Sequence, residues 1–222
     1  MKKGFLRRLG LIHYAEAMDI QRAVFESRRS CETQDTLLIM QHFPVVTIGS
    51  SGREDHILVD RQFLRERGIE IYVTDRGGDV TFHGPEQVVA YPIFNLKELG
   101  IGVEEYVRKT EEVVIRTLNE SNVKGTRLKG FPGVWVDHKK ICSVGFRVSR
   151  WITKHGLALN VNGDLDSFDL IVPCGIKGVS MTSMERILGR RVDTEEVEGR
   201  VISNFSAIFH IELEEITGMV VA

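Results

Sequence analysis

Apolar residues recur at helical spacing in three stretches of the chain, residues 13–29, 103–120 and 194–209. In the second stretch the apolar positions form one face and the opposite face is charged, as in a helix that packs on a sheet. Asp193 precedes the third stretch, and Glu196 follows three residues later, which is the spacing of a helix-capping pair. The pattern therefore predicts three long helices.

Shorter apolar segments are typical of β-strands. Continuous or alternating apolar runs cover residues 4–12, 37–40, 45–49, 69–73 and 88–94. Residues 134–136 and 140–148 flank a polar turn at 137–139 and predict a β-hairpin. Asp60 is expected to cap a short helix that ends at Gly68. Residues 123–182 as a whole are predicted to be rich in strands.

The composition bounds the class of protein. With 222 residues, 42% of them hydrophobic and 27% charged, the chain can bury a substantial core. No repeat or long linker interrupts it, so we expect one domain over residues 1–222, with residues 183–222 as a helical C-terminal cap. A formal charge of −2 gives no basic footprint for nucleic acid. No apolar run approaches the roughly 20 residues that span a bilayer, and no signal peptide is expected, so a membrane association is not predicted.

The cysteines differ in their surroundings. Cys31, Cys142 and Cys174 are odd in number and far apart, so we expect no disulfide framework and a reducing, cytoplasmic compartment. No Cys/His cluster has metal-ligand spacing, so no metal site is expected. Cys174 stands between Pro173 and Gly175 after an apolar run, which predicts a sharp turn at the end of a strand. The pattern alone leaves open whether this thiol is reactive or buried and inert.

Alternation divides the strand 140–148 into two faces. The apolar face carries Cys142, Val144, Phe146 and Val148. Continued backwards, the alternation places Lys140 on this apolar face and Lys139 on the opposite, solvated one. Because lysine is rarely buried without a partner, two interpretations remain open: Lys140 belongs to a site, or the strand begins after it and its side chain extends to solvent. Cys142 is predicted to pack in the core.

The stretch 76–87, with the sequence RGGDVTFHGPEQ, is rich in potential binding groups. Gly77 and Gly78 let the backbone approach a ligand closely or adopt positive φ. They precede His83 and a buried strand, so the segment can line a pocket with backbone N–H groups, a cation and an imidazole. The alternative is a glycine-rich hairpin with a satisfied histidine.

Several blocks of the chain resemble the octanoyltransferases of lipoate biosynthesis. RGGDVTFHGPEQ is similar to the RGGxxTYHGPGQ signature of that family, residues 155–160 resemble its HGxALN stretch, and residues 173–176 resemble its PCGI segment. Lys140 begins a KIxxxG segment like that of the family. Glu86 stands where the family usually has glycine and Phe82 where tyrosine is common, so the turn and any hydroxyl contact at position 82 are expected to differ.

The resemblance implies an α+β fold like that of lipoate and biotin protein ligases, with a mixed β-sheet flanked by helices and a small second sheet. It makes Cys174 the acyl-carrying catalytic nucleophile and Lys140 its catalytic acid–base partner. It also implies a set of substrate-binding residues on the glycine-rich loop and two later strands: Arg76, Gly77, Gly78, Asp79, Val80, Thr81, Phe82, His83, Ser143, Val144, Gly145, Gly156, Leu157 and Ala158.

The implied reaction moves an octanoyl group from octanoyl-acyl carrier protein to a lysine of lipoyl-domain proteins, through a thioester on Cys174. The expected acceptors are E2 subunits of 2-oxoacid dehydrogenases and the glycine cleavage H protein. The phosphopantetheine arm belongs to the carrier protein, so no cofactor bound by the enzyme is expected. Two alternatives remain. An ATP-dependent lipoate-protein ligase needs no nucleophilic cysteine, and a non-catalytic acyl-binding module has no reason to keep both Cys174 and Lys140.

Overall fold

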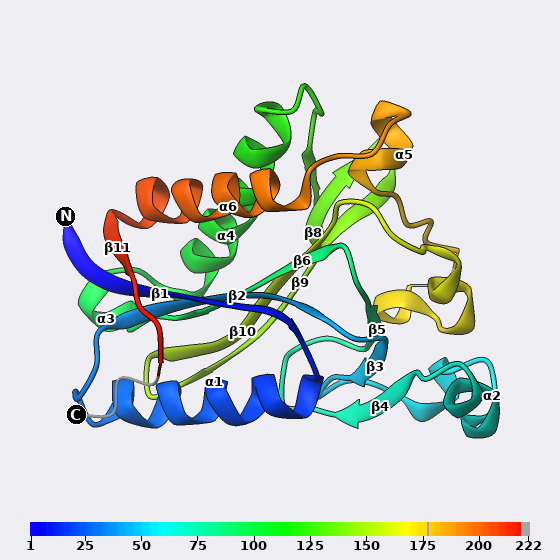
Figure 1. Ribbon diagram of the computed structural model, residues 1–222, viewed down its shortest axis with the longest axis horizontal. Coiled ribbons are helices and arrows are strands. Elements are labelled where there is room, and N and C mark those ends of the chain that lie inside the picture. Colours follow the sequence, from blue (N-terminus) through cyan, green and yellow to red (C-terminus); the bar gives the residue numbers. More distant parts are fainter. Residues whose placement is uncertain (177, 219–222) are drawn as a thin grey trace.

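Two β-sheets, with helices on their faces, make up the fold (Figure 1). The structure is a computed structural model that describes residues 1–176 and 178–218. The strands are β1 (Lys2–Ile12), β2 (Asp35–His42), β3 (Val45–Ile48), β4 (Glu70–Val73), β5 (Val80–His83), β6 (Gln87–Ile93), β7 (Thr126–Leu128), β8 (Phe131–Val136), β9 (Lys139–Ser149), β10 (Ile152–Asn160) and β11 (Ile211–Glu215). The α-helices are α1 (Tyr14–Arg29), α2 (Arg61–Glu66), α3 (Leu96–Leu99), α4 (Val103–Asn119), α5 (Met184–Leu188) and α6 (Thr194–Phe209).

The sheet topology confirms the predicted fold class. Within the described residues, the large sheet has the strand order β11-β1-β2-β6-β10-β9-β8-β7 and the small sheet has the order β4-β3-β5. In the large sheet β1 is parallel to both β11 and β2, and every other pair of neighbours is antiparallel. The fold is therefore α+β, with a large mixed sheet and a small second sheet.

Helices cover both faces of the large sheet. In Figure 1, α1 runs below the sheet, and α4 and α6 lie above it. The core on the α4/α6 side includes Tyr106 and Phe205, and the core on the α1 side includes Phe25 and Met40. Because both faces are covered, the central strands are buried on both sides, which explains their continuous apolar runs.

The three predicted long helices are confirmed as α1, α4 and α6. The side chain of Asp193 accepts hydrogen bonds from the Glu195 and Glu196 N–H groups and so caps α6. The predicted hairpin is also confirmed, since Asp137 and His138 connect β8 to β9 with φ values of 47° and 63°, the left-handed conformation that a tight two-residue hairpin turn requires. No helix among the described residues is long and apolar enough to cross a membrane.

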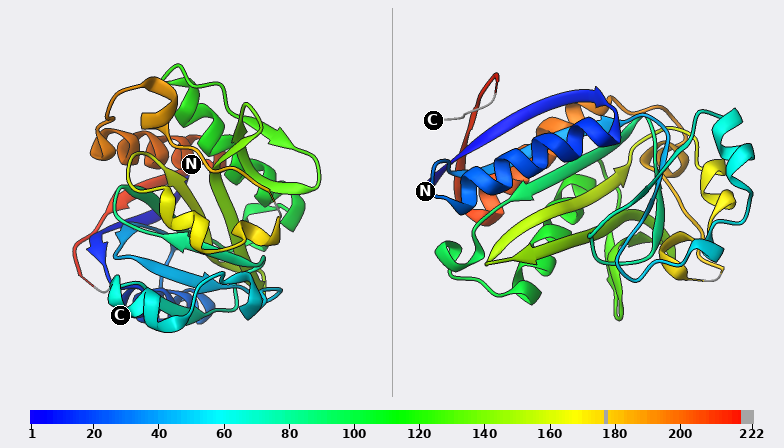
Figure 2. Two further views of the ribbon diagram at one scale, coloured as in Figure 1. Left: turned by 90° about the vertical axis from the view of Figure 1, so that its right-hand side faces the viewer. Right: turned by 90° about the horizontal axis from the view of Figure 1, so that it is seen from below.

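The chain leaves the large sheet after β2 and returns to it at β6. β3 follows β2 by only two residues, yet it pairs with β4 and β5 in the small sheet. α2 follows β3 and precedes β4 in the chain, and Asp60 caps it by accepting from the Phe63 N–H, as predicted. Apolar runs alone did not indicate that neighbouring strands belong to different sheets. The small sheet and the segment 165–175 lie side by side at one end of the fold (Figure 2), where β5 contacts residues Pro173–Gly175.

A β-bulge in β9 determines the direction of Lys140. The register between β8 and β9 shifts by one residue at Ile141, which is the extra residue of the bulge. Ile141 and Cys142 both pack in the α4/α6 core, whereas Lys140 and Ser143 both reach Cys174. The prediction that Lys140 shares a face with Cys142 is therefore wrong, because the extra residue reverses the alternation.

The C-terminal part of the chain packs on the large sheet. α6 lies against α4 and β6, and β11 pairs with β1 at the sheet edge. α5 precedes them and is capped by Ser183, whose hydroxyl accepts from the Arg186 N–H. Residues 219–222 of the predicted cap lie outside the described residues.

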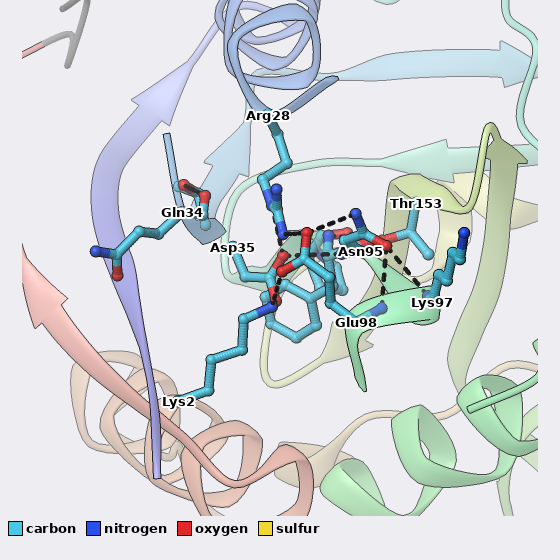
Figure 3. A network of polar contacts seen from close by, with 11 residues as sticks. Lys2, Arg28, Gln34, Asp35, Asn95, Lys97, Glu98 and Thr153 are labelled. Atoms are coloured by element: carbon cyan, nitrogen blue, oxygen red, sulfur yellow. Dashed lines mark hydrogen bonds and ion pairs between the residues drawn. The ribbon is translucent and has the colours of Figure 1, made fainter. Parts of the chain in front are cut away.

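A buried network of charges joins four elements at the end of the molecule that carries the N-terminus (Figure 3). The Asp35 carboxylate, which is fully buried at the start of β2, accepts from Arg28 Nε at 2.8 Å, from Lys2 Nζ at 2.9 Å and from the Asn95 N–H at 2.8 Å. Arg28 and Lys2 also pair with Glu98. The network therefore joins β1, α1, β2 and the start of α3.

Asp35→Asn is expected to lower the free energy of unfolding by about 3 kcal/mol or more, because it removes the buried carboxylate of the pair and leaves the buried Arg28 guanidinium with only the half-exposed Glu98 as counter-charge. Glu98→Gln removes a partner that is 43% exposed and should cost about 1 kcal/mol or less. Urea unfolding of the two variants and the wild type measures both values. Equal losses in the two variants would contradict the buried role assigned to Asp35.

Candidate functional site

Cys174 and Lys140 meet at the end of the fold where the two sheets lie together. Lys140 Nζ lies 3.2 Å from Cys174 Sγ, and Ser143 Oγ lies 3.9 Å from the same sulfur. Lys140 is only 2% exposed, so its amine is held in place rather than free in solvent. At this distance the amine and the thiol can exchange a proton directly.

The backbone at Cys174 forms the sharp turn that its neighbours predict, but the strand expected before the turn is not present. Asp166–Leu170 form a short 3-10 helix, and Ile171 makes only an isolated bridge to Ile57. Cys174 has φ 57° and ψ 18°, a left-handed conformation that costs about 1–3 kcal/mol for a residue with a side chain. Gly175 also has positive φ, and a Cβ added there would lie 2.5 Å from an Asp79 carboxylate oxygen. Glycine at position 175 thus allows the turn to close against Asp79, whose carboxylate also bonds to His56 Nδ1 at 2.7 Å.

Lys140 is held between β8 and the segment Ser180–Thr182. The backbone N–H of Lys140 donates to the Ser180 carbonyl, and the backbone carbonyl of Lys140 accepts from the Thr182 N–H. These two bonds tie the segment after Cys174 to β9. Lys140 Nζ lies 5.4 Å from the centre of the Trp135 ring. A Cβ at Gly133 would come within 2.8 Å of Lys140 Cε, so the glycine on β8 makes room for the lysine.

A cavity of about 530 Å³ contains the Cys174–Lys140 pair. Its apolar lining includes Val107, Val144, Phe146 and Leu157. All of the predicted substrate-binding residues except two line it: Arg76, Gly77, Gly78, Asp79, Thr81, His83, Ser143, Val144, Gly145, Gly156, Leu157 and Ala158. The cavity therefore offers room for an apolar chain next to a thiol and an amine.

The two exceptions, Val80 and Phe82, point away from the cavity. In β5, Thr81 and His83 line the cavity, and alternation directs Val80 and Phe82 into the core of the small sheet. Phe82 packs edge-to-face on Phe168, with 5.7 Å between ring centres, and lines a separate hollow of about 440 Å³. The absence of a tyrosine hydroxyl at position 82 therefore does not alter the lining of the cavity.

Arg76 holds the shape of the glycine-rich loop. Its guanidinium is buried and donates to the carbonyls of Thr47, Gly77 and Asp79 at 2.7–3.1 Å. The Gly77 N–H donates in turn to the Phe146 carbonyl at 2.9 Å. A Cβ at Gly145 would lie 2.9 Å from the Gly77 carbonyl oxygen, so close approach of the loop to β9 depends on glycine there.

Glu86 adopts the conformation that a glycine would adopt easily. Its φ is 64°, in the left-handed region. Its N–H donates to the Gln41 side chain at 2.7 Å, its carbonyl accepts from Val161 and Asn162, and its carboxylate pairs with Arg191. These contacts maintain the turn, although glutamate stands where the octanoyltransferase signature usually has glycine.

Sequence reasoning missed three polar residues at the cavity. Tyr91 and His155 line it, and His42 lies directly behind Tyr91, with its Nε2 3.0 Å from the Tyr91 hydroxyl. His155 stands in a recognised motif, but nothing in the spacing indicated that its Nε2 lies 2.8 Å from Asp75. A single hydroxyl within the buried run of β6 was the available signal for Tyr91, because a buried tyrosine needs a polar partner.

Burial of the His42 and His83 imidazoles predicts a loss of stability in acid. Desolvation lowers the pKa of His42 to about 4 and that of His83 to about 3, from an ordinary value near 6.5. Below pH 6.5 these two histidines therefore bind protons in the unfolded chain but stay neutral in the folded chain. The free energy of unfolding should fall as the pH is lowered from 6.5 to 4. His42→Gln should reduce this slope by up to about 1.4 kcal/mol per pH unit, as measured by urea unfolding. Parallel curves for variant and wild type would contradict the assignment.

Comparison with known proteins gives the family. Residues 13–206 match the lipoyl protein ligase A/B catalytic domain. The octanoyltransferase of Caldanaerobacter subterraneus subsp. tengcongensis is 46% identical over 217 residues, which cover 97% of this chain and 94% of that protein. The octanoyltransferase of Koribacter versatilis is 45% identical over 206 residues, 90% of this chain and 82% of that protein.

Solved structures support the fold. A lipoate-protein ligase A bound with ATP superposes with a TM-score of 0.80 at 19% identity, over 98% of this chain and 90% of that one. One bi-partite lipoate protein ligase, from Thermoplasma acidophilum, gives a TM-score of 0.78 at 16% identity, over 99% of this chain and 89% of that one. At such identities the likeness concerns the fold alone. The sequence relatives and the matched domain show more: the chain belongs to the octanoyltransferases, a family of acyltransferases with the lipoyl protein ligase A/B catalytic domain.

Proposed function

We propose that the chain transfers an octanoyl group from octanoyl-acyl carrier protein to a lysine of a lipoyl-domain protein, through a thioester on Cys174. The observation that carries the proposal is the 3.2 Å contact between Lys140 Nζ and Cys174 Sγ, within a cavity that has an apolar wall. E2 subunits of 2-oxoacid dehydrogenases and the glycine cleavage H protein are the acceptors that fit this reaction. A nucleophilic thiol has to stay reduced, which favours a cytoplasmic setting.

In the first step, Cys174 Sγ attacks the carbonyl carbon of the donor thioester. The proton of the Cys174 thiol passes to Lys140, the bond between the carbonyl carbon and the phosphopantetheine sulfur breaks, and Lys140 returns the proton to the departing thiolate. The products are the octanoyl-cysteine and a free phosphopantetheine thiol. Val144 and Leu157, which line the cavity, form a wall for the octanoyl tail.

In the second step, the ε-amine of the acceptor lysine attacks the carbonyl carbon of the octanoyl-cysteine. The bond to Cys174 Sγ breaks, and the amine gives up one proton, which Lys140 carries to the sulfur. The products are an amide on the acceptor and a free Cys174 thiol. Lys140 thus acts first as base and then as acid in each step.

Both steps pass through an oxyanion, which needs N–H donors placed in advance. A backbone N–H group that already donates within the fold cannot serve, which excludes several of the residues that line the cavity. The Gly77 N–H already donates to Phe146. Leu157 and Ala158 lie in β10 between two paired strands, which leaves their N–H groups to the sheet. By contrast, β8 pairs with β9 no further than Cys142, and Gly78 N–H has no partner among the described residues. Because the Phe146 carbonyl accepts from Gly77 at this free edge, alternation places the Val144 N–H there too and directs the N–H groups of Ser143 and Gly145 to β10. The N–H groups of Gly78 and Val144 are therefore the oxyanion donors that we propose.

The competing functions differ in what they need. A ligase activates a free acid with ATP and requires no thiol, and the structural likeness to such ligases concerns only the fold. We propose that this chain requires neither nucleotide nor bound cofactor, because the donor thioester is already activated. A binding module without catalysis would form no covalent acyl adduct.

The test is an intact-mass measurement after incubation with octanoyl-acyl carrier protein in the absence of ATP, followed by addition of a lipoyl-domain protein. We expect one octanoyl group on the chain at Cys174, which then moves to the acceptor. Transfer that depends on ATP and free octanoate, without an adduct, would assign a ligase. Reversible binding without any adduct would assign a binding module.

A further inference from the structure

A chain of buried amides leads from the backbone to His83 in the wall of the cavity. Asn160 Nδ2 donates to the Thr182 carbonyl at 3.0 Å, and Gln87 Nε2 donates to Asn160 Oδ1 at 2.9 Å. Gln87 Oε1 then faces His83 Nδ1 at 2.7 Å. Gln87, Asn160 and His83 are each at most 6% exposed, so water does not compete for these bonds.

The donors and acceptors in this row of hydrogen bonds can be arranged in only one way. A backbone carbonyl can only accept, so the Asn160 amide group points its NH₂ to Thr182 and its oxygen to Gln87. The Gln87 NH₂ therefore faces Asn160, and its oxygen faces the imidazole. His83 Nδ1 must then carry the hydrogen, and Nε2 keeps a lone pair. Nε2 has no hydrogen-bond partner among the described residues and is not among the fully buried unpaired atoms, so it remains open to the cavity that the ring lines.

Hydrogen bonds also determine where the neighbouring groups carry their lone pairs. His42 Nδ1 lies 3.3 Å from the Ile12 carbonyl and so carries the hydrogen, which leaves Nε2 to accept the hydrogen of the Tyr91 hydroxyl. His155 Nε2 donates to the Asp75 carboxylate, and its buried Nδ1 has no partner among the described residues. The rings of His83, His42, Tyr91 and His155 follow one another with 5.7–6.0 Å between centres. Since its hydrogen goes to His42, the Tyr91 oxygen keeps its lone pairs, and it lines the cavity together with His83. The lone pair of His42 Nε2 is used by Tyr91, and His155 Nδ1 is buried, so the acceptors on this wall are His83 Nε2 and the Tyr91 oxygen.

We propose that His83 Nε2 binds the N–H of the acceptor lysine in the second step, so that this side of the cavity is the amine subsite of the enzyme. The inference rests on the proposed octanoyl transfer and goes further, since it assigns His83 to the amine rather than to the donor thioester. A lone pair cannot stabilise an oxyanion, whereas it can hold and orient an amine through one N–H.

His83 orients the amine without removing its proton. Burial lowers the pKa of His83 to about 3, so the ring is a poor base at neutral pH. The amine loses one proton to Lys140 as its nitrogen bonds to the carbonyl carbon, and the bond to Cys174 Sγ breaks. A second N–H stays on the amide nitrogen. His83 is thus a residue that positions the nucleophile, and its loss should affect only the step in which an amine takes part.

The test compares the two half-reactions in His83→Asn. Asparagine keeps a short N–H donor for Gln87 Oε1 and removes Nε2. Acyl-enzyme formation from octanoyl-acyl carrier protein should stay within about threefold of wild type, which also shows that the variant is folded. Transfer from the isolated acyl-enzyme to a lipoyl-domain protein should slow about ten- to a hundredfold, the effect of one lost hydrogen bond to a strongly polar group. His13→Asn, on an exposed histidine that does not line the cavity, should change neither step.

Gln87→Met is measured in parallel, because it keeps His83 but frees the imidazole to carry its hydrogen on Nε2. It too should slow transfer more than acyl-enzyme formation. Equal slowing of both steps, or an unchanged transfer rate in His83→Asn, overturns the amine subsite and leaves octanoyl transfer intact. Absence of any acyl-enzyme in the wild type overturns both the proposed function and the subsite.

Discussion

Replacing Cys174 with alanine is expected to abolish both the octanoyl adduct and transfer to the acceptor. Among the described residues, Cys174 Sγ is the sulfur that Lys140 Nζ contacts. The Ser143 hydroxyl, 3.9 Å from that sulfur, is a far weaker nucleophile than a thiol and cannot form a thioester. The left-handed turn and its glycine neighbour do not depend on the thiol, so the variant should fold. Intact mass and an acyl-transfer assay measure the two losses.

The other cysteines are the matched controls. Cys142 is fully buried among apolar side chains, and burial raises the pKa of its thiol to about 12, so it stays protonated at neutral pH. Cys31 is exposed after α1 and does not line the cavity that contains Cys174. Cys142→Ala and Cys31→Ala should therefore keep the adduct and the transfer. An adduct that maps to Cys142 would show that the wrong cysteine has been assigned.

Much of the fold follows from local patterns. The stripes of α4 and α6, the Asp193 cap and the tight turn at Asp137–His138 each depend on residues close together in the sequence. Such features are set by propensity and periodicity, so they could be predicted from the sequence. The setting of Cys174 between proline and glycine was likewise a local signal, and its left-handed turn confirms that signal.

Features that depend on residues far apart in the sequence could not be predicted from local patterns. The two-residue link between β2 and β3 gives no sign that the strands belong to different sheets, because sheet membership depends on partners far away in the sequence. An alternating pattern of apolar and polar residues cannot predict the β-bulge at Ile141, although this extra residue turns Lys140 toward Cys174. The pairing of His155 with Asp75 bridges 80 residues and also has no local signature.

Lys140→Ala is expected to slow octanoyl transfer by about 10²–10⁴-fold, the usual contribution of a positioned acid–base group. The lysine is the amine closest to the sulfur in the described structure, at 3.2 Å, and its position is fixed by Trp135, Gly133 and the Ser180–Thr182 segment. Truncation removes the group that takes and returns the proton in both steps. Single-turnover acylation and deacylation rates should therefore fall together, in contrast to the selective effect expected for His83.

Lys139→Ala is the control for charge and sequence position. Lys139 is exposed at the start of β9 and pairs with Val136, on the solvent side of the hairpin. Its removal should leave both rates near those of the wild type, and alkylation of Cys174 by iodoacetamide at pH 7 should slow only in Lys140→Ala. If Lys140→Ala is alkylated as fast as the wild type while transfer is lost, the lysine moves protons but does not activate the thiol. If neither rate changes, the 3.2 Å contact is structural and another group must serve as the base.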